Sequence, residues 1–498
     1  MSLYRTKSID ELVKASEAPS SRLRRSLGLW SLVALGIGSV IGSGIFTFTG
    51  TAAAGTRMDL PSVFKAPVLD MILNGGPVAV VGRPGAGPAI SLSFVLVAIA
   101  CGFAALCYAE LASMIPVAGS AYTYAYATMG EIFAWIIGWD LILEYAVSNM
   151  AVAVGFGAYM NDLVDNLLGF HLPMELSNPV FAGGKATGAW FNLPAFLLLM
   201  LLSWILVRGV KESAEANNSM VLIKLVAILL FVFGAARAVN TANWHPFMPN
   251  GFPGVLTGGA IVFFTYIGFD SVSTAAEECR SPQRDLPLGI LITLAACALL
   301  YASVALVLTG IAHWDTLNND APVANALKAL GFNRLRLVVT VGALLGMVSS
   351  LLVFQYGQAR IWFAMSRDRL LPPLFSRVHP KFNTPHLSTW IAGFVVGIPA
   401  GIWDIGTLGD LTNIGTLFAF IVVSAGVIIL RRAQPGRARS FRVPWVPVLP
   451  GLSILCCLVL MLSLPLETWI RFLAWLVIGL CIYFFYGRKR TLAASERE

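Results

Sequence analysis

The sequence predicts an all-α integral membrane protein with about twelve transmembrane helices. Hydrophobic residues make up 57% of the 498 positions and charged residues only 12%, with a mean hydropathy of +0.76. A soluble protein normally carries about 25% charged residues. A helix needs about 20 apolar residues to span a bilayer, and apolar runs of about this length recur throughout the chain. They lie at 29–54, 88–115, 132–159, 189–207, 219–239, 254–276, 286–311, 337–365, 388–403, 411–430, 446–464 and 468–486.

The basic residues indicate how the chain is oriented. An even number of spans puts both termini on one side of the membrane, and short loops rich in Lys and Arg normally face the cytosol. The basic clusters on this side are Arg22, Arg24 and Arg25, then Arg367, Arg369, Arg377 and Lys381, then Arg431, Arg432, Arg437, Arg439 and Arg442, and finally 488–490. Residues 1–28 are polar and basic, without a convincing cleavable signal, so we expect cytosolic termini. Basic loops scattered over one membrane face also argue against nucleic-acid binding.

The cysteines and histidines predict no metal or cofactor site. The seven cysteines lie in or beside predicted spans, and the five histidines lie mostly in loops. Their spacing fits neither a zinc site nor a disulfide framework, so we interpret the cysteines as small packing residues. No cluster of histidines or carboxylates near an interface indicates acid–base or metal chemistry, and we therefore expect no enzyme. A channel is also disfavoured, because the spans carry isolated charges and no continuous polar stripe.

Two spans are unusually rich in glycine. The span 29–54 contains GIGSVIGSGIF at 36–46, and the span 254–276 contains Gly258, Gly259 and Gly268 followed by Asp270. Two interrupted helices five spans apart are typical of inverted-repeat transporters. Short segments with an amphipathic pattern at 117–131 and 317–332 are also five spans apart. We therefore predict a first repeat at 29–240, a second at 241–430, two further helices at 431–487 and a cytosolic tail at 488–498.

The connection 56–87 is unusually long for an outer loop of this protein. Its apolar residues between Val63 and Leu73 have helical spacing, which predicts a short surface helix. The following GRPGAGP segment lacks the Gly-Lys-Ser/Thr ending of a phosphate loop, and we interpret it as a flexible connection.

Charged residues at membrane depth mark functional or paired positions, because each costs at least about 2.5 kcal/mol at a helix centre. Four such residues stand out: Asp140, Glu144, Lys224 and Asp270. Lys224 has two interpretations, a snorkelling side chain or a buried cation that replaces a coupling ion or changes protonation. Glu144 shares a helix face with Asp140, and pairing with a substrate ammonium, a basic group or solvent stays open for these two.

Two further acids are given mainly structural interpretations. We expect Asp270 to satisfy backbone N–H groups beyond Gly268 and Glu110 to make a structural contact. Gly36 and Gly38 are interpreted as positions of close helix packing.

The glycine break predicts a site for an α-amino acid. Unwinding would free the N–H groups of Gly42, Ser43 and Gly44 at the start of a half-helix, where they can bind a carboxylate. The freed carbonyls of Val40, Ile41 and Phe264 can accept hydrogen bonds from an ammonium. The apolar side chains that would line the cavity are Phe263, Phe264, Tyr266 and Ile267. Backbone groups do not identify the side chain of the substrate.

The motifs resemble the cationic amino acid transporter family of the amino acid-polyamine-organocation superfamily, in its bacterial twelve-helix members. The matching segments, in order, are GIGSVIGSGIF, CGFAALCYAELASMIPVAGSAYTYAYATMGE, GWDLILEY, FFTYIGFDSVSTAAEE, RSPQRDLPLGI, LTNIGTLFAF and FRVPWVPVLP. The resemblance implies the five-plus-five inverted-repeat fold shared with sodium-coupled neurotransmitter transporters, discontinuous first and sixth helices, and uptake of L-amino acids across the bacterial cytoplasmic (plasma) membrane, commonly with protons. The long connection 56–87 departs from the compact bacterial pattern.

The resemblance also implies roles for individual residues. Substrate-binding positions are Val40, Ile41, Gly42, Ser43, Gly44, Phe264 and Ile267, with Lys224 as the lysine that replaces sodium in proton-coupled members and Glu144 as an acid of the third helix. Phe354 occupies an expected pocket position that is small in members with long cationic substrates. We therefore predict small or medium neutral L-amino acids such as alanine. Cationic amino acids or polyamines are the alternative substrates, and a non-transporting amino acid sensor is the second alternative.

Overall fold

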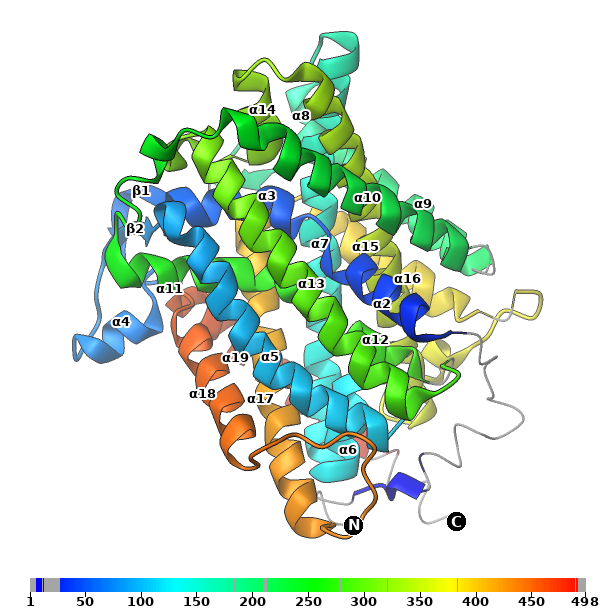
Figure 1. Cartoon of the computed structure of the whole chain (residues 1–498). Coiled ribbons are helices and arrows are strands. Elements are labelled where there is room, and N and C mark those ends of the chain that lie inside the picture. The colour runs from blue at the N-terminus through cyan, green and yellow to red at the C-terminus, as the bar shows by residue number, and fades with distance from the viewer. Residues whose placement is uncertain are drawn as a thin grey trace.

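The computed structural model describes residues 6–10, 12, 27–117, 119–182, 185–208, 213–276, 279–319, 321–382, 384–488 and 490. Within these ranges the chain is a bundle of helices (Figure 1). Eight helices are long and apolar enough to cross a membrane, and a bent pair makes a ninth. Three shorter apolar helices accompany them.

Every predicted span coincides with apolar helix. The helices that correspond to the spans, in chain order, are α2 (Leu29–Val40) with α3 (Gly44–Ala54), α5 (Ile90–Met114), α7 (Glu131–Leu168), α9 (Leu193–Arg208), α10 (Ser213–Ala235), α11 (Gly251–Val262), α13 (Pro282–Ile311), α15 (Asn333–Arg367), α16 (His386–Ala400), α17 (Ile405–Ala433), α18 (Val448–Leu462) and α19 (Leu466–Ile482). At 1.5 Å per residue, the 15 to 16 residues of α9, α16 and α18 give only about 24 Å of helix, less than the hydrocarbon core of a bilayer.

Local sequence signals set several helix ends. The helix α13 begins with Pro282, whose missing N–H is not needed in the first turn. The helix α7 ends at Gly169, which takes a left-handed conformation with φ of 72°. Large apolar side chains remain exposed on the outside of the bundle, as on α10, where Leu222 is 63% and Phe233 is 72% exposed. A surface of this kind suits lipid.

The long connection between α3 and α5 forms a folded unit. Strand β1 (Gly55–Ser62) pairs antiparallel with β2 (Val80–Pro84), with Thr56 opposite Arg83. The predicted surface helix is present but short, as α4 (Val68–Leu73). The prediction of a flexible GRPGAGP segment is wrong, because β2 and the turn η1 (Gly87–Ala89) occupy it.

The two predicted amphipathic segments both contain helices, at opposite ends of the bundle (Figure 1). The helix α14 (Pro322–Ala329) buries one face and exposes Asn325 and Lys328, as predicted. The helix α6 (Ser120–Thr128) is buried on every side, so its prediction as a segment with one polar, exposed face is wrong. Packing against both α7 and α17 explains this burial.

Structural roles predicted for three residues agree with the packing. Glu110 accepts hydrogen bonds from Arg431 Nε and Nη2, both at 2.7 Å, and from Arg439 Nε at 3.1 Å. Gly36 packs against Thr293 and Gly38 against Asn217.

Some predicted features fall outside the described ranges. They include Arg22, Arg24 and Arg25 of the N-terminal segment and residues 491–498 of the tail. The cysteines are all free thiols. Among the described residues, no group of three or more His, Cys, Asp or Glu side chains is placed to hold a metal ion.

Candidate functional site

The first glycine-rich span is broken at the predicted residues. The helix α2 ends at Val40, α3 begins at Gly44, and the two helices are bent by 44°. Ile41, with φ of −84° and ψ of 85°, is not helical. Residues 41–43 therefore form a break in the middle of a buried span.

The second glycine-rich span is broken as well. Its helix α11 gives way to a 3-10 turn, η4 (Phe263–Tyr266), and helix resumes only in α12 (Ser271–Thr274). Gly268 between them has φ of 114°, in the region that favours glycine. The two breaks touch, since a β-carbon on Gly44 would lie 2.9 Å from Cα of Thr265.

Lys224 of α10 reaches the first break. Its Nζ donates hydrogen bonds of 2.8 Å to the carbonyls of both Gly38 and Ile41, and the residue is fully buried. The snorkelling interpretation is therefore wrong, because the ammonium points into the protein and away from the interface. Lys224 supplies a cation to carbonyls that the end of α2 leaves without a helical donor.

The three carbonyls predicted to be free each have a donor in the protein. Ile41 O accepts from Lys224, and Phe264 O accepts from the N–H of Ile267 at 3.3 Å. Val40 O accepts from the N–H of Gly42 at 3.1 Å and lies 3.0 Å from the Tyr301 hydroxyl. That hydroxyl also lies 2.8 Å from Thr265 O, so Tyr301 of α13 links the two breaks. A substrate ammonium would have to use remaining lone pairs of these carbonyls.

The other side of the first break has groups without partners. Within the described part of the chain, no acceptor receives the N–H of Ser43 or Gly44. The hydroxyls of Ser39, Ser43 and Thr47 are buried and also have no partner there. Buried polar groups are usually paired, so this cluster of donors at the start of α3 suits an anionic ligand.

The long helices α15 and α7 each pack one face against the first break. On α15, Gly346 packs against Lys224, and Ser350 donates a hydrogen bond of 2.8 Å to Ser39 O. Phe354 lies one turn beyond Ser350 on the same face, is buried, and meets Tyr145 of α7 edge to face at 5.6 Å between ring centroids.

The helix α7 contributes a matching face. A β-carbon on Gly155 would lie 2.9 Å from Cβ of Ser43, and Val152 comes within 3.6 Å of the corresponding position on Gly42. Ser148, one turn before Val152, has a buried hydroxyl without a partner in the described chain. The break is thus enclosed by α7, α10, α13 and α15.

Three acids gather beside this enclosure. Glu144 lies on α7 one turn before Ser148, interacts electrostatically with Asp270 and Asp140, and lies beside Thr416. Asp140 is fully buried, and neither of its carboxylate oxygens has a partner among the described residues. Among the described residues, no basic group forms an ion pair with either Asp140 or Glu144. Their pairing with a substrate ammonium or with solvent stays a prediction.

Asp270 agrees with its prediction in part. Its carboxylate interacts with backbone N–H groups of Gly268, Asp270 and Ser271 and accepts a hydrogen bond of 3.4 Å from the Ser120 hydroxyl, although it makes no side-chain cap on α12.

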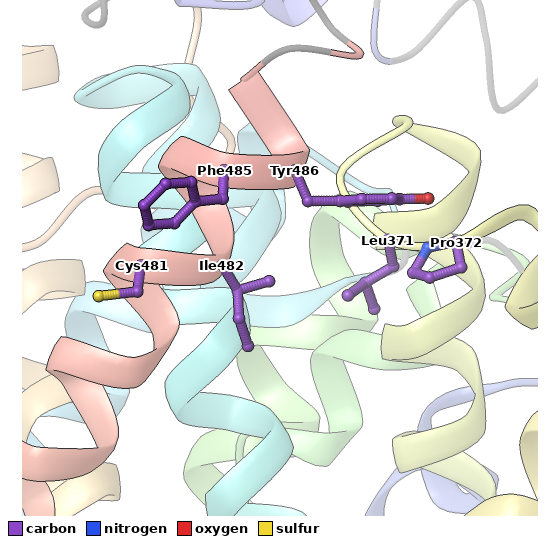
Figure 2. Close-up of a pocket in the computed structure, with 6 residues that line it drawn as sticks. All are labelled: Leu371, Pro372, Cys481, Ile482, Phe485 and Tyr486. Carbon is purple, nitrogen blue, oxygen red and sulfur yellow. The ribbon is translucent and has the colours of Figure 1, made fainter.

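A surface pocket lies elsewhere. It is lined by Leu371, Pro372, Cys481, Ile482, Phe485 and Tyr486. Figure 2 shows these side chains coming from the end of α19, from the π-helical turn η8 (Tyr483–Gly487) that follows it, and from the chain after α15. None of the residues predicted to bind substrate lines it. We therefore treat the break as the candidate site.

Sequence reasoning missed Tyr301, Ser350 and Ser39. Tyrosine and serine occur often enough in membrane helices that their polar groups give no distinct signal. Tyr301, midway along α13, offered the strongest available hint, because a buried tyrosine hydroxyl usually finds a partner.

The family profile and related proteins that match this chain are named as permeases or transporters. The profile of a family described as amino acid permease matches residues 27–485. The chain is 45% identical to the branched-chain amino acid permease BcaP of Bacillus subtilis, over 98% of both chains. It is also 45% identical to the methylthioribose transporter of that species, over 99% of both. A more distant relative is cationic amino acid transporter 9, chloroplastic, of Arabidopsis thaliana, at 33% identity over 94% of this chain and 88% of that protein.

Proposed function

Because the chain belongs to the amino acid permease family, we propose that it is a secondary active L-amino acid transporter that works by alternating access. In this proposal residues 29–240 and 241–430 are inverted five-helix repeats, and 431–487 are two additional helices. The two touching breaks and the opposite placement of α6 and α14 support the repeat (Figure 1). The relatives are named as permeases and transporters, which fits a protein that is not an enzyme.

The observation that carries the proposal is that the protein itself pairs the carbonyls of Val40, Ile41 and Phe264, whereas hydrogen-bond donors at the start of α3 have no described partner. Lys224 occupies the carbonyl side, whereas the N–H groups of Ser43 and Gly44 and three nearby hydroxyls have no described partner. In the proposal these donors bind the substrate carboxylate. The substrate ammonium uses the second lone pairs of the Val40, Ile41 and Phe264 carbonyls.

The position of Lys224 supports transport that is not coupled to sodium. Sodium sites in proteins are built from oxygen ligands, and here the Lys224 ammonium already lies on two carbonyl oxygens. We propose that Lys224 and Glu144 take part in proton coupling. The termini lie in the cytosol, and the membrane is the bacterial cytoplasmic membrane.

The proposed substrates are small or medium neutral amino acids, from alanine to the branched-chain residues. Phe354 lies one turn beyond Ser350 on the α15 face that packs on the break, and its ring shortens the space that a long side chain would need. A relative at 45% identity is named for branched-chain amino acids. Cationic amino acids and polyamines remain the alternative.

Counterflow in proteoliposomes tests this proposal. We expect labelled leucine and alanine to exchange in buffer whose sodium has been replaced by choline, and excess arginine to inhibit them weakly. A Phe354→Ser variant should gain arginine inhibition, because it opens space beyond Ser350. Strong arginine exchange by the unmodified protein would overturn the neutral preference.

The sensor alternative is separated by the same experiment. A sensor would show saturable leucine binding in a thermal-shift assay, since a ligand stabilises the folded state by mass action, but no counterflow.

A further inference from the structure

Arg83 of β2 has an unusual environment at the outer connection. Its Nη1 donates hydrogen bonds of 2.9 and 2.7 Å to the two carboxylate oxygens of Asp410 on α17. The Arg83 side chain is only 10% exposed. The opposite edge of the guanidinium, Nε and Nη2, is buried and has no hydrogen-bond partner among the described residues.

Two other arginines of this protein, the half-buried Arg431 and the buried Arg336, use that edge to hold a carboxylate. Arg431 binds Glu110 through Nε and Nη2, both at 2.7 Å. Arg336 donates from the same edge to a single oxygen, Oδ1 of Asp162, through Nε at 2.9 Å and Nη2 at 2.5 Å. Two parallel N–H groups match the spacing of carboxylate oxygens, which makes this edge a bidentate receptor. On Arg83 this edge has no partner among the residues that the structure describes.

The position of Arg83 relates it to the proposed transport path. Gly409, next to Asp410, packs on the ring of Phe48, and Phe48 contacts Phe264 in a tilted arrangement with centroids 4.6 Å apart. Phe48 lies four residues after Gly44, so one helical turn of about 6 Å separates this aromatic pair from the break. Arg83 and Asp410 thus lie beyond the aromatic pair, on the side of the β1–β2 hairpin.

The hairpin is fixed to both broken spans at this point. The N–H of Ala86 donates to Ala52 O of α3 at 2.9 Å, and Asn250, just before α11, donates to Gly85 O at 2.8 Å. A movement of α3 and α11 that opens the path would therefore also uncover the neighbouring Arg83.

We propose that Arg83 and Asp410 form a second, outer binding site for a zwitterionic amino acid, which is occupied before the break. The free edge of Arg83 binds the α-carboxylate. Asp410, which already orients Arg83, accepts from the ammonium with its remaining lone pairs. This inference rests on the proposed transport function and on the outer side assigned to the hairpin.

The Arg83→Lys variant tests the site, because lysine keeps a positive charge beside Asp410 but lacks the bidentate edge. We would measure leucine counterflow from the hairpin side of oriented proteoliposomes, and leucine affinity at equilibrium by thermal shift. The KM from that side should rise about tenfold, because charge-assisted bidentate hydrogen bonds are lost. The maximal rate and the affinity of the central site should stay within about twofold of the unmodified values.

A matched control separates binding from anchoring of the hairpin. Lys65→Gln removes the ion pair between Lys65 and Glu467 that ties the same connection to α19. It leaves Arg83 untouched, so the KM should not change. An unchanged KM in Arg83→Lys, or equal increases in both variants, would overturn the outer site.

The remaining outcomes identify other failures. The KM for leucine would also be measured with chloride replaced by gluconate. If this replacement changes the KM of the unmodified protein but not that of Arg83→Lys, the free edge of Arg83 binds an inorganic anion, and the proposed amino acid site is wrong. If the unmodified protein shows no counterflow, the proposed transport function itself fails, together with the site that rests on it.

Discussion

The break at residues 41–43 and the break at residues 263–270 leave their polar groups in different states. In the second break and the first turn of α12 that follows it, the hydroxyls of Thr265, Ser271 and Ser273 donate to carbonyls three residues earlier in the chain, at 2.5 to 2.6 Å. In the first break, the hydroxyls of Ser39 and Ser43 have no described partner. Of the carbonyls there, Ile41 O depends on Lys224 of α10, and Val40 O is reached by Tyr301 of α13 as well as by the N–H of Gly42.

This difference teaches which break is suited to a ligand. A break that satisfies its own groups gains little from an added hydrogen bond, whereas unpaired buried groups cost about 1 to 3 kcal/mol each until a partner arrives. We therefore assign ligand recognition mainly to the first break and a supporting, wall-forming role to the second. Three predictions test this assignment, beginning with the largest effect.

Lys224→Met should abolish accumulation driven by a proton gradient. The variant removes the hydrogen bonds that the Lys224 ammonium donates to Gly38 O and Ile41 O, and it removes the positive charge beside these carbonyls. Leucine affinity by thermal shift should fall by less than about tenfold, because the N–H groups of α3 remain.

The exposed Lys328→Met, which removes a surface ion pair with Asp165, is the control and should keep accumulation. A full response to the proton gradient in Lys224→Met would exclude a coupling role for Lys224.

Gly44→Ala should weaken transport strongly. The added methyl group would lie 2.8 Å from Cγ2 and 2.9 Å from Cα of Thr265, so the two breaks would have to separate. Overpacking of this kind costs about 1 to 3 kcal/mol, equivalent to about 5-fold to 150-fold in kcat/KM for counterflow. Gly102→Ala on α5, where no atom lies within 4 Å, provides the control and should transport normally. Normal transport by Gly44→Ala would contradict the close contact of the breaks.

Ser43→Ala and Ser271→Ala should separate recognition from stability. Loss of the unpartnered Ser43 hydroxyl should lower leucine affinity about tenfold, since a hydrogen bond to a charged group contributes about 1.5 to 3 kcal/mol. The melting temperature of the ligand-free protein should not fall, because the hydroxyl that is removed is buried and has no described partner. Loss of the Ser271 hydroxyl, which donates to Gly268 O, should lower stability by about 1 kcal/mol with little effect on affinity. The reverse pattern in thermal-shift titrations would exchange the roles of the two breaks.

The helices and the breaks were predictable because they depend on local composition. Hydropathy alone located the apolar helices, and the glycines of 36–46 located the first break within a few residues. The burial of α6 was not predictable, since its nine residues show no sign of the contacts that α7 and α17 make with it. The β1–β2 hairpin was missed for a similar reason. Its strands are separated by a helix, and their pairing is a nonlocal contact.

The candidate site was predictable only in part. Gly42, Ser43 and Gly44 were expected to present free N–H groups. The structure leaves those of Ser43 and Gly44 without a described acceptor, but the prediction is wrong for Gly42, whose N–H donates to Val40 O. The carbonyls of Val40 and Ile41 were expected to be free as well, but Tyr301 and Lys224 reach them from residues more than 180 positions away.

The sequence by itself determined that this chain lies in a membrane, where its helices run and where one of them breaks, because these properties follow from the solvation of side chains and backbone over short stretches. Only the tertiary structure decided which groups of each break are satisfied. A hydrogen bond between Lys224 and Ile41, or between Arg83 and Asp410, depends on atoms within 3 Å of each other, and the packing of distant helices sets those distances. The same packing left the N–H groups at Ser43 and the outer edge of Arg83 open.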